Sequence, residues 1–224
     1  MDYTRSMLEI VKSDTYEQWF RKLKDRQAQV RINARILRVR QSGHFGDVKP
    51  ARDGVSEMRI DHGPGYRIYF MQRGSVVVVV VALAGGDKST QDGRHQDGDQ
   101  DRQGMEGLSM AEKFTRWDAV DYLENEGDMA LYLDACLDED PGDGSLVRAA
   151  FNDIARARGM TQLARDTGLT REGLYRALSS SGNPEFSTVL RVIKALKIRL
   201  HATPATPPKP RRAPRKKSGD MAVA

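Results

Sequence analysis

The sequence predicts an α+β unit, with a small antiparallel sheet and two helices, followed by an all-α helix-turn-helix unit. Three observations support this fold class. Residues 1–91 mix helical spacing with extended apolar runs, residues 111–202 carry only helical patterns, and the stretch between them has no apolar period. The 224 residues suffice for two domains of about 100 residues each. We therefore expect a linker at 92–110 and a disordered tail at 203–224.

The first unit is predicted to run β-α-α-β-β-β. Residues 7–11 (MLEIV) are typical of a short strand, and Asp14 is a candidate cap for a helix. That helix presents three apolar residues on one face: Trp19, Phe20 and Leu23. A second helix, at about 27–40, points one set inward (Val30, Ala34, Leu37 and Val39) and another outward (Arg31, Arg35 and Arg38).

Three extended runs follow this second helix. Residues 56–61 and 66–71 flank a turn built on Gly63, Pro64 and Gly65, which predicts an antiparallel hairpin. Residues 76–83 are apolar at every position, as expected of a strand buried on both faces.

Four cationic residues lie on or at the end of these predicted strands: Lys49, Arg59, Arg67 and Lys88. Arg59 and Arg67 flank the hairpin turn and can be cross-strand neighbours. Such a group could bind RNA phosphate and stabilise the charge that develops when a 2′-hydroxyl attacks phosphorus. Ordinary solvated surface cations are the alternative reading of the same residues.

Residues 3–91 resemble the HigB branch of the RelE-type toxins, including phage-derived members. The strings GDVKPARDGVSEMRIDHGPGYRIYF and GGDKSTQ carry this resemblance. It implies a RelE-like fold and a metal-independent endoribonuclease that cleaves ribosome-bound mRNA, an mRNA interferase. In that case Arg67 would contact the scissile phosphate, Lys49 and Arg59 would assist proton transfer or stabilise charge, and Lys88 would line the site. Tyr66 is expected in the core.

The second unit begins with a strongly acidic stretch. Residues 116–124 and 128–139 carry apolar residues at helical spacing, and Cys136 is expected in the core. Between Arg116 and Arg148 there are ten acidic residues and no Lys or Arg. Residues 1–91 carry a net charge of +6 (16 − 10). We therefore expect the two halves to attract each other and to screen the four strand cations from RNA.

A helix-turn-helix motif follows a helix that Ser145 is expected to cap and that runs to Arg158. Residues 161–166 form a short helix, Gly168 the turn, and Thr170 the cap of a second helix over 171–178. Such a second helix presents side chains to the DNA major groove. The candidate DNA-binding residues are Gln162, Thr170, Arg171, Glu172, Tyr175 and Arg176. A purely structural helical hairpin is the alternative.

Ser187 is expected to open a final helix that buries Val189, Leu190, Ile193 and Leu196. From AEKFTRWDAVDYL through RDTGLTREGLYRALS to GNPEFSTVLRVIKAL, residues 111–201 resemble the HigA-type antidote proteins of addiction modules. This resemblance implies toxin binding and repression of the protein's own operon. It also implies operator DNA as a partner and allows a homodimer.

Residues 92–110 have two possible origins, an evolved flexible linker or a shifted reading frame between two adjacent genes. Read one base later, one permitted choice of codons encodes DDIKTAIKIAREWRD and then a stop codon before Met110. This peptide has the spacing of an amphipathic helix with four basic and four acidic residues, and the toxin-like half otherwise lacks such a helix at its end. The tail at 203–224, with a net charge of +5 (6 − 1), is either a solvated terminus or a non-specific phosphate-binding segment.

Several classes of function are excluded or left without support. The longest apolar run is far too short to cross a membrane and the N-terminus has no signal-peptide pattern, so we expect a cytoplasmic protein. One cysteine excludes an internal disulfide, and the four histidines are scattered without metal-ligand spacing. We expect no metal and no cofactor.

Two function classes remain. The first is a fused type II toxin–antitoxin protein, in which an mRNA interferase-like half pairs with its antidote within one chain or between chains. The second is a DNA-binding transcriptional repressor whose toxin-like half is catalytically inactive. Both predict binding to operator DNA, and cleavage of ribosome-bound mRNA separates them.

Overall fold

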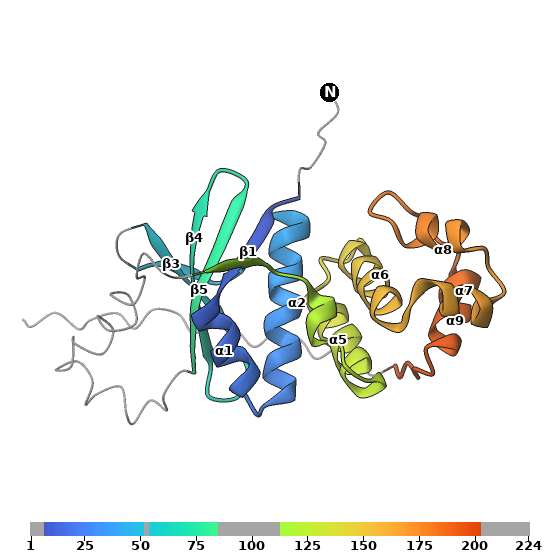
Figure 1. Cartoon of the computed structure of the whole chain (residues 1–224), viewed down its shortest axis with the longest axis horizontal. Coiled ribbons are helices and arrows are strands. Elements are labelled where there is room, and N and C mark those ends of the chain that lie inside the picture. Colours follow the sequence, from blue (N-terminus) through green and yellow to red (C-terminus); the bar gives the residue numbers. More distant parts are fainter. Residues whose placement is uncertain (1–6, 52–53, 85–112, 203–224) are drawn as a thin grey trace, which may run out of the picture.

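A computed structural model describes residues 7–51, 54–84 and 113–202 of the chain. A sheet with two helices against it forms one end of the molecule, and a group of helices forms the other (Figure 1). This confirms the predicted fold class, α+β followed by all-α. Among the described residues, no helix is both long and apolar enough to cross a membrane.

The sheet is mixed, whereas a purely antiparallel sheet was expected. Its strands lie in the order β2-β3-β4-β5-β1-β6, and β1 pairs with β5 in parallel. The other neighbouring pairs are antiparallel. The strands span Glu9–Ser13 (β1), Val48–Pro50 (β2), Val55–Ile60 (β3), Tyr66–Arg73 (β4), Val76–Ala84 (β5) and Phe114–Arg116 (β6).

The last strand, β6, belongs to the second half of the chain yet extends the sheet of the first. Its Arg116 lies opposite Val11 of β1, and its Phe114 lies opposite Ser13. The helix predicted over 116–124 is therefore wrong. Arg116 is extended because its backbone pairs with β1, and only a short 3₁₀ turn, η2 (Ala119–Tyr122), follows.

Two helices cover one face of the sheet, α1 (Asp14–Lys22) and α2 (Arg26–Ser42). Ser13 caps α1, because its side chain accepts a hydrogen bond from the Tyr16 amide at 3.1 Å. The expected cap, Asp14, is instead the first helical residue, where its charge favours the positive end of the helix dipole. Asp25 caps α2, which ends at Gly43 in the left-handed conformation.

The hairpin of β3 and β4 is confirmed, with Arg59 opposite Arg67. Alternate residues of these strands are buried against the helices: Met58, Ile60, Tyr66, Ile68 and Phe70. In β5, Val77 and Val79 are buried while Val76 and Val78 are only partly covered, so burial on both faces does not hold there. The side chains of residues 80–84 lie outside the described part.

The second half is helical after η2. Its helices are α5 (Glu126–Glu139), α6 (Ser145–Arg158), α7 (Met160–Thr167), α8 (Arg171–Leu178) and α9 (Phe186–Ala195). Ser145 begins α6 but does not cap it. The Asp140 carboxylate accepts from the amides of Leu146 and Val147 and satisfies the first turn instead.

One continuous hydrophobic core joins the two halves. Buried residues of the first half, such as Phe20 and Ile36, belong to the same cluster as Trp117 and Leu133 of the second. Cys136 is fully buried, as expected. In α9 the expected inward residue Leu190 is 47% exposed, because Val192 and Ile193 take the buried face.

Candidate functional site

Helix α2 lies between the sheet and the second half, where it contacts α5 and α6 (Figure 1). We call the contact between residues 7–84 and residues 113–158 the seam. Three arginines of α2 that were expected to face solvent lie in the seam. Arg35 and Arg38 both bind the Glu139 carboxylate, with Nη2–Oε1 at 2.5 Å and Nη1–Oε2 at 2.8 Å respectively. Arg31 binds Asp138 at 3.2 Å.

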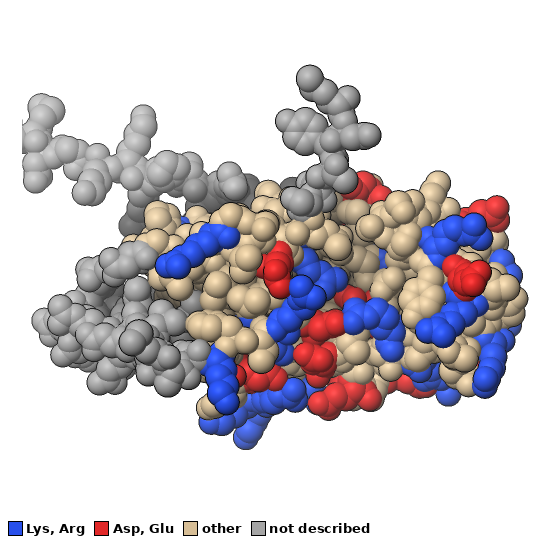
Figure 2. Space-filling model, turned by 45° about the horizontal axis from the view of Figure 1, so that its top comes forward, with Lys and Arg blue, Asp and Glu red and all other residues tan. Residues whose placement is uncertain are grey.

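These pairs realise the expected attraction between a basic and an acidic half. Figure 2 shows basic and acidic side chains alternating across the middle of the molecule, where the halves meet. Burial alone would raise the pKa of Glu139, but the guanidinium groups of Arg35 and Arg38 outweigh burial and lower it. Glu139 therefore stays ionised at neutral pH inside the seam.

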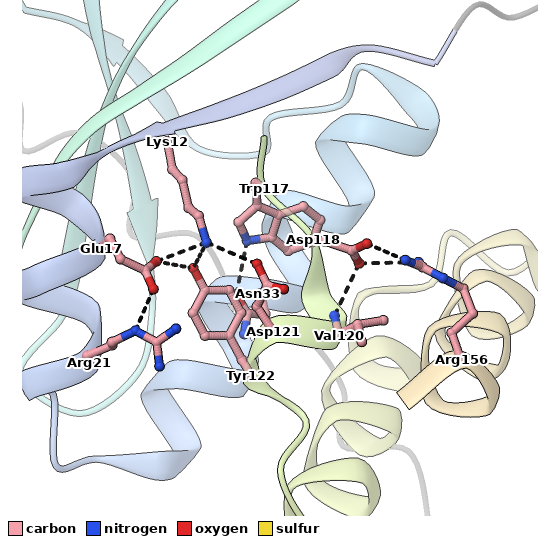
Figure 3. Close-up of polar contacts among 10 residues, drawn as sticks. All are labelled: Lys12, Glu17, Arg21, Asn33, Trp117, Asp118, Val120, Asp121, Tyr122 and Arg156. Carbon is pink, nitrogen blue, oxygen red and sulfur yellow. Dashed lines mark hydrogen bonds and ion pairs between the residues drawn. The ribbon is translucent and has the colours of Figure 1, made fainter. Parts of the chain in front are cut away.

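A second cluster in the seam surrounds the buried Lys12 of β1, which is 4% exposed (Figure 3). Its ammonium lies 3.0 Å from Glu17 Oε2 and 3.2 Å from Asp121 Oδ2, and it donates to the Tyr122 hydroxyl at 2.7 Å. The Tyr122 hydroxyl in turn donates to Glu17 at 2.5 Å. A buried charge needs such partners, and two of the three come from the second half.

The pKa values in this cluster follow from burial and from these bonds. Burial raises the pKa of Glu17, but hydrogen bonds from Tyr122, Lys12 and Arg21 outweigh it, so the net shift is downward. Burial also raises the pKa of Tyr122, which keeps its hydroxyl protonated and able to donate. The cluster is therefore a salt bridge that is complete only when the second half is docked.

Trp117 anchors the start of the second half and is 1% exposed. Its indole Nε1 donates to Asn33 Oδ1 of α2 at 3.3 Å, and its backbone amide donates to the carbonyl of Ile10. The Arg40 guanidinium lies 5.5 Å from the ring centroid. The next residue, Asp118, pairs with Arg156 of α6 (Figure 3). The sequence analysis missed this anchor. The available signal was a tryptophan directly before the acidic stretch that begins at Asp118.

Three of the predicted cations, Lys49, Arg59 and Arg67, lie on the sheet face away from the buried side chains. Lys49 is opposite Glu57, and Arg59 is opposite Arg67. The structure thus brings three of the four predicted cations together, while Lys88 lies outside the described residues. Tyr66 is buried, as expected.

Glu57 sits among these cations and was missed by sequence reasoning. Its Oε1 lies 2.6 Å from Arg59 Nε and 3.5 Å from Arg67 Nε, and its Oε2 accepts from the Tyr69 hydroxyl. The hydrogen bond to Glu57 raises the pKa of Arg59. The alternation of Glu57 with Arg59 along β3 was the available signal.

In the described part of the chain, the second half does not screen Lys49, Arg59 or Arg67, contrary to expectation. The side chains of Arg59 and Arg67 are 37% and 31% exposed, and within the described residues their ion pairs are with Glu57 alone. Lys49 is exposed. The acidic half packs instead on α2 and β1. The net charges of the two halves predict that they attract each other but not which basic residues are covered. The acidic half pairs with the arginines of α2 instead of the strand cations.

Helices α7 and α8 are joined by a turn at Gly168, close to the predicted positions. Gly168 makes the turn with φ of 68°, and Thr170 Oγ1 caps α8 by accepting from the Gly173 amide at 3.0 Å. Leu163 and Leu174 are fully buried between the helices. All six candidate DNA-binding residues are exposed: Gln162, Thr170, Arg171, Glu172, Tyr175 and Arg176.

Two arginines of α8 are available to a ligand. Arg171 stacks at 5.5 Å from the Tyr175 ring centroid. Within residues 113–202 and the rest of the described chain, neither Arg171 nor Arg176 forms an ion pair. Gln162 donates to Asp166 at 2.8 Å on the exposed side of α7. Helix α6 holds the end of α8, because Asn152 donates to the Leu178 carbonyl.

Comparison with known proteins shows that the second half is similar to a described family. Residues 113–204 match the family described as "Probable addiction module antidote protein". Two similar proteins, each called an uncharacterized protein, come from Haemophilus influenzae (strain ATCC 51907 / DSM 11121 / KW20 / Rd). One is 48% identical over 91 residues, which are 41% of this chain and 92% of the relative. The other is 51% identical over 78 residues, 35% of this chain and 76% of the relative. No solved structure matches the chain.

Proposed function

We propose a fused type II toxin–antidote protein, since the chain belongs to the family of these Haemophilus influenzae relatives and its residues 113–204 match the addiction-module antidotes. The observation that carries this proposal is the seam. An antidote half that extends the sheet of the first half, and neutralises the arginines of α2, is bound to it as to a partner protein. Covalent linkage raises the effective concentration of that partner to about millimolar.

The first half is proposed to be the toxin, a metal-independent endoribonuclease acting on ribosome-bound mRNA. Lys49, Arg59 and Arg67 meet on one exposed face, where they could hold a phosphate and stabilise charge on it, and Lys88 is proposed to join them. Positioned donors of this kind need no metal ion.

The second half is proposed to bind the operator DNA of its own gene through α8. The exposed residues Arg171 and Arg176 would read bases or phosphates in the major groove. Gln162 and Thr170 would bind the DNA backbone, and Glu172 and Tyr175 would lie beside them. A homodimer is proposed as the operator-bound state, because conventional repressor half-sites occur in pairs.

One observation favours a second candidate function, a DNA-binding repressor with an inactive first half. Glu57 pairs with Arg59 and Arg67 and reduces the positive potential of the face that would bind RNA. In that case the seam would be a structural remnant. Operator binding is common to both functions, so only mRNA cleavage distinguishes them.

The DNA proposal predicts that Arg171→Ala and Arg176→Ala each weaken binding to the DNA upstream of the gene by roughly 1–3 kcal/mol if the arginine is bidentate to guanine. A fluorescence-anisotropy titration of a labelled upstream duplex measures this. Arg73→Ala is the matched control, because it removes the same charge from an exposed position on β4, in the first half. If Arg171→Ala and Arg176→Ala bind as tightly as Arg73→Ala, α8 is not the recognition helix.

A further inference from the structure

The turn between α1 and α2 carries a dense group of cations beside the seam. We call residues 21–26 the corner. They include Arg21, Lys22, Lys24 and Arg26, all of them exposed. These side chains line a half-open cavity of about 350 Å³ together with Tyr122 and Glu124 of the second half. The corner therefore belongs to the first half, while one wall of its cavity is supplied by the antidote half.

The antidote half neutralises part of the corner. Arg26 lies 3.7 Å from Glu124 and 3.9 Å from Asp128. Among the described residues Lys22 and Lys24 form no ion pair. Residues 21–26 contain four cations and one acid, Asp25, and so have a net charge of +3; one of the cations, Arg21, pairs with Glu17 of α1. Docking adds Glu124 and Asp128 and lowers this net charge to +1.

The shape of the corner is fixed before any ligand arrives. The Gln29 side chain donates to the carbonyls of Phe20 and Leu23 at 3.1 and 2.8 Å, and it accepts from Arg26 at 2.9 Å. The Asp25 cap holds the first turn of α2. The backbone that carries the four cations is thus rigid, while Lys22 and Lys24 keep their ammonium groups in solvent. Such an arrangement suits repeated phosphate groups.

We propose that the corner is a phosphate-binding surface for single-stranded RNA, and that Glu124 and Asp128 of the antidote half compete with RNA phosphates for it. The choice of RNA rests on the proposed function, in which the first half acts on mRNA. The cavity would admit phosphates from a flexible strand that bends into it. The strand cations Lys49, Arg59 and Arg67 form a separate surface, because they lie on the sheet face away from α1 and α2, whereas the corner connects these two helices.

The test uses the full chain and a labelled 12-nucleotide 2′-O-methyl oligouridylate, which lacks the attacking 2′-hydroxyl and cannot be cut. Anisotropy titrations over a range of salt concentrations give both the Kd and its salt dependence. Each phosphate contact to a single strand contributes about 0.7 to the slope of log K against log salt. Changing Lys22→Gln and Lys24→Gln together is expected to weaken binding and to reduce that slope by about 1.4. Glu124→Gln is expected to tighten binding and to steepen the slope by up to about 0.7, since Arg26 then loses the nearer of its two carboxylate partners and only Asp128 remains.

Matched controls remove equal charge elsewhere. Arg73→Gln with Lys194→Gln controls for the lysines, and Asp134→Asn, exposed on α5, controls for Glu124. If the Kd and salt dependence of the Lys22→Gln, Lys24→Gln variant equal those of its control, the corner does not bind phosphate. An unchanged affinity in Glu124→Gln would overturn the competition. If the double lysine substitution weakens binding to an unrelated 12-base-pair DNA duplex as much as binding to the oligouridylate, the choice of RNA is overturned. Because the probe is not cleaved, an inactive first half would leave these outcomes readable.

Discussion

Replacing Trp117 with alanine is expected to lower the free energy of unfolding by about 3–5 kcal/mol, the usual cost of truncating a buried aromatic side chain. The indole is 1% exposed and lies where β6 leaves the sheet and the second half begins. Its removal leaves a cavity and deprives Asn33 of a buried donor. The loss of stability should affect both halves, because they share one hydrophobic core.

Urea unfolding of the parent and Trp117→Ala chains measures this effect as a shift in midpoint at constant slope. Phe114→Ala is the matched control, since Phe114 lies three residues earlier on β6 and is 47% exposed. Its substitution is expected to change stability by about 0.5 kcal/mol or less. Equal losses in the two variants would mean that the indole does not hold the halves together.

Lys12→Met is expected to destabilise the chain by about 3 kcal/mol. Removing one partner of a buried ion pair leaves an uncompensated charge, which typically costs about 3–5 kcal/mol. The expected value is at the lower end because the side chain of Asp121 still reaches solvent and Glu17 keeps its bonds with Tyr122 and Arg21.

A double-mutant cycle with Glu17→Gln checks the cause, because neutralising the carboxylate that has lost Lys12 should recover part of the loss. Lys22→Met is the control, since Lys22 is exposed and forms no ion pair with a described residue. If Lys12→Met is as stable as Lys22→Met, the buried cluster contributes nothing to the seam.

Local patterns predicted the elements that form by themselves. The helical spacing of α2 and the hairpin around Gly63–Gly65 are both found, and so is the α7–turn–α8 motif. The three-residue strand β6 escaped prediction because it has no period of its own and is extended only through pairing with β1. The cap of α1 fell on Ser13 instead of Asp14, since adjacent residues of both types can cap a helix.

Long-range arrangement explains what else was missed at the candidate sites. Periodicity showed that Arg31, Arg35 and Arg38 point away from the sheet, but it could not show that α5 covers them. The hairpin predicted that Arg59 and Arg67 are neighbours, but not that the Glu57 carboxylate pairs with both. Two of the three partners of Lys12, Asp121 and Tyr122, lie more than a hundred residues away, so no local pattern signals them.

Cleavage of ribosome-bound mRNA without added metal tests most directly whether the first half is a ribonuclease restrained within this chain. Three proteins are compared: the full chain, residues 1–91, and residues 1–91 extended by DDIKTAIKIAREWRD. The extended protein is expected to cut mRNA, and Arg67→Ala in it to lower the rate by roughly 10²–10³-fold, the cost of losing one donor aimed at a developing charge. Arg73→Ala should leave the rate unchanged.

The full chain is expected to be inactive. The second half does not cover Lys49, Arg59 or Arg67, so the inactivity of the full chain would come from the missing C-terminal helix and not from masking. Residues 1–91 alone lack the same helix and are therefore expected to be weak or inactive as well. If the extended protein also leaves ribosome-bound mRNA intact, the first half is not a ribonuclease and the chain is a DNA-binding repressor.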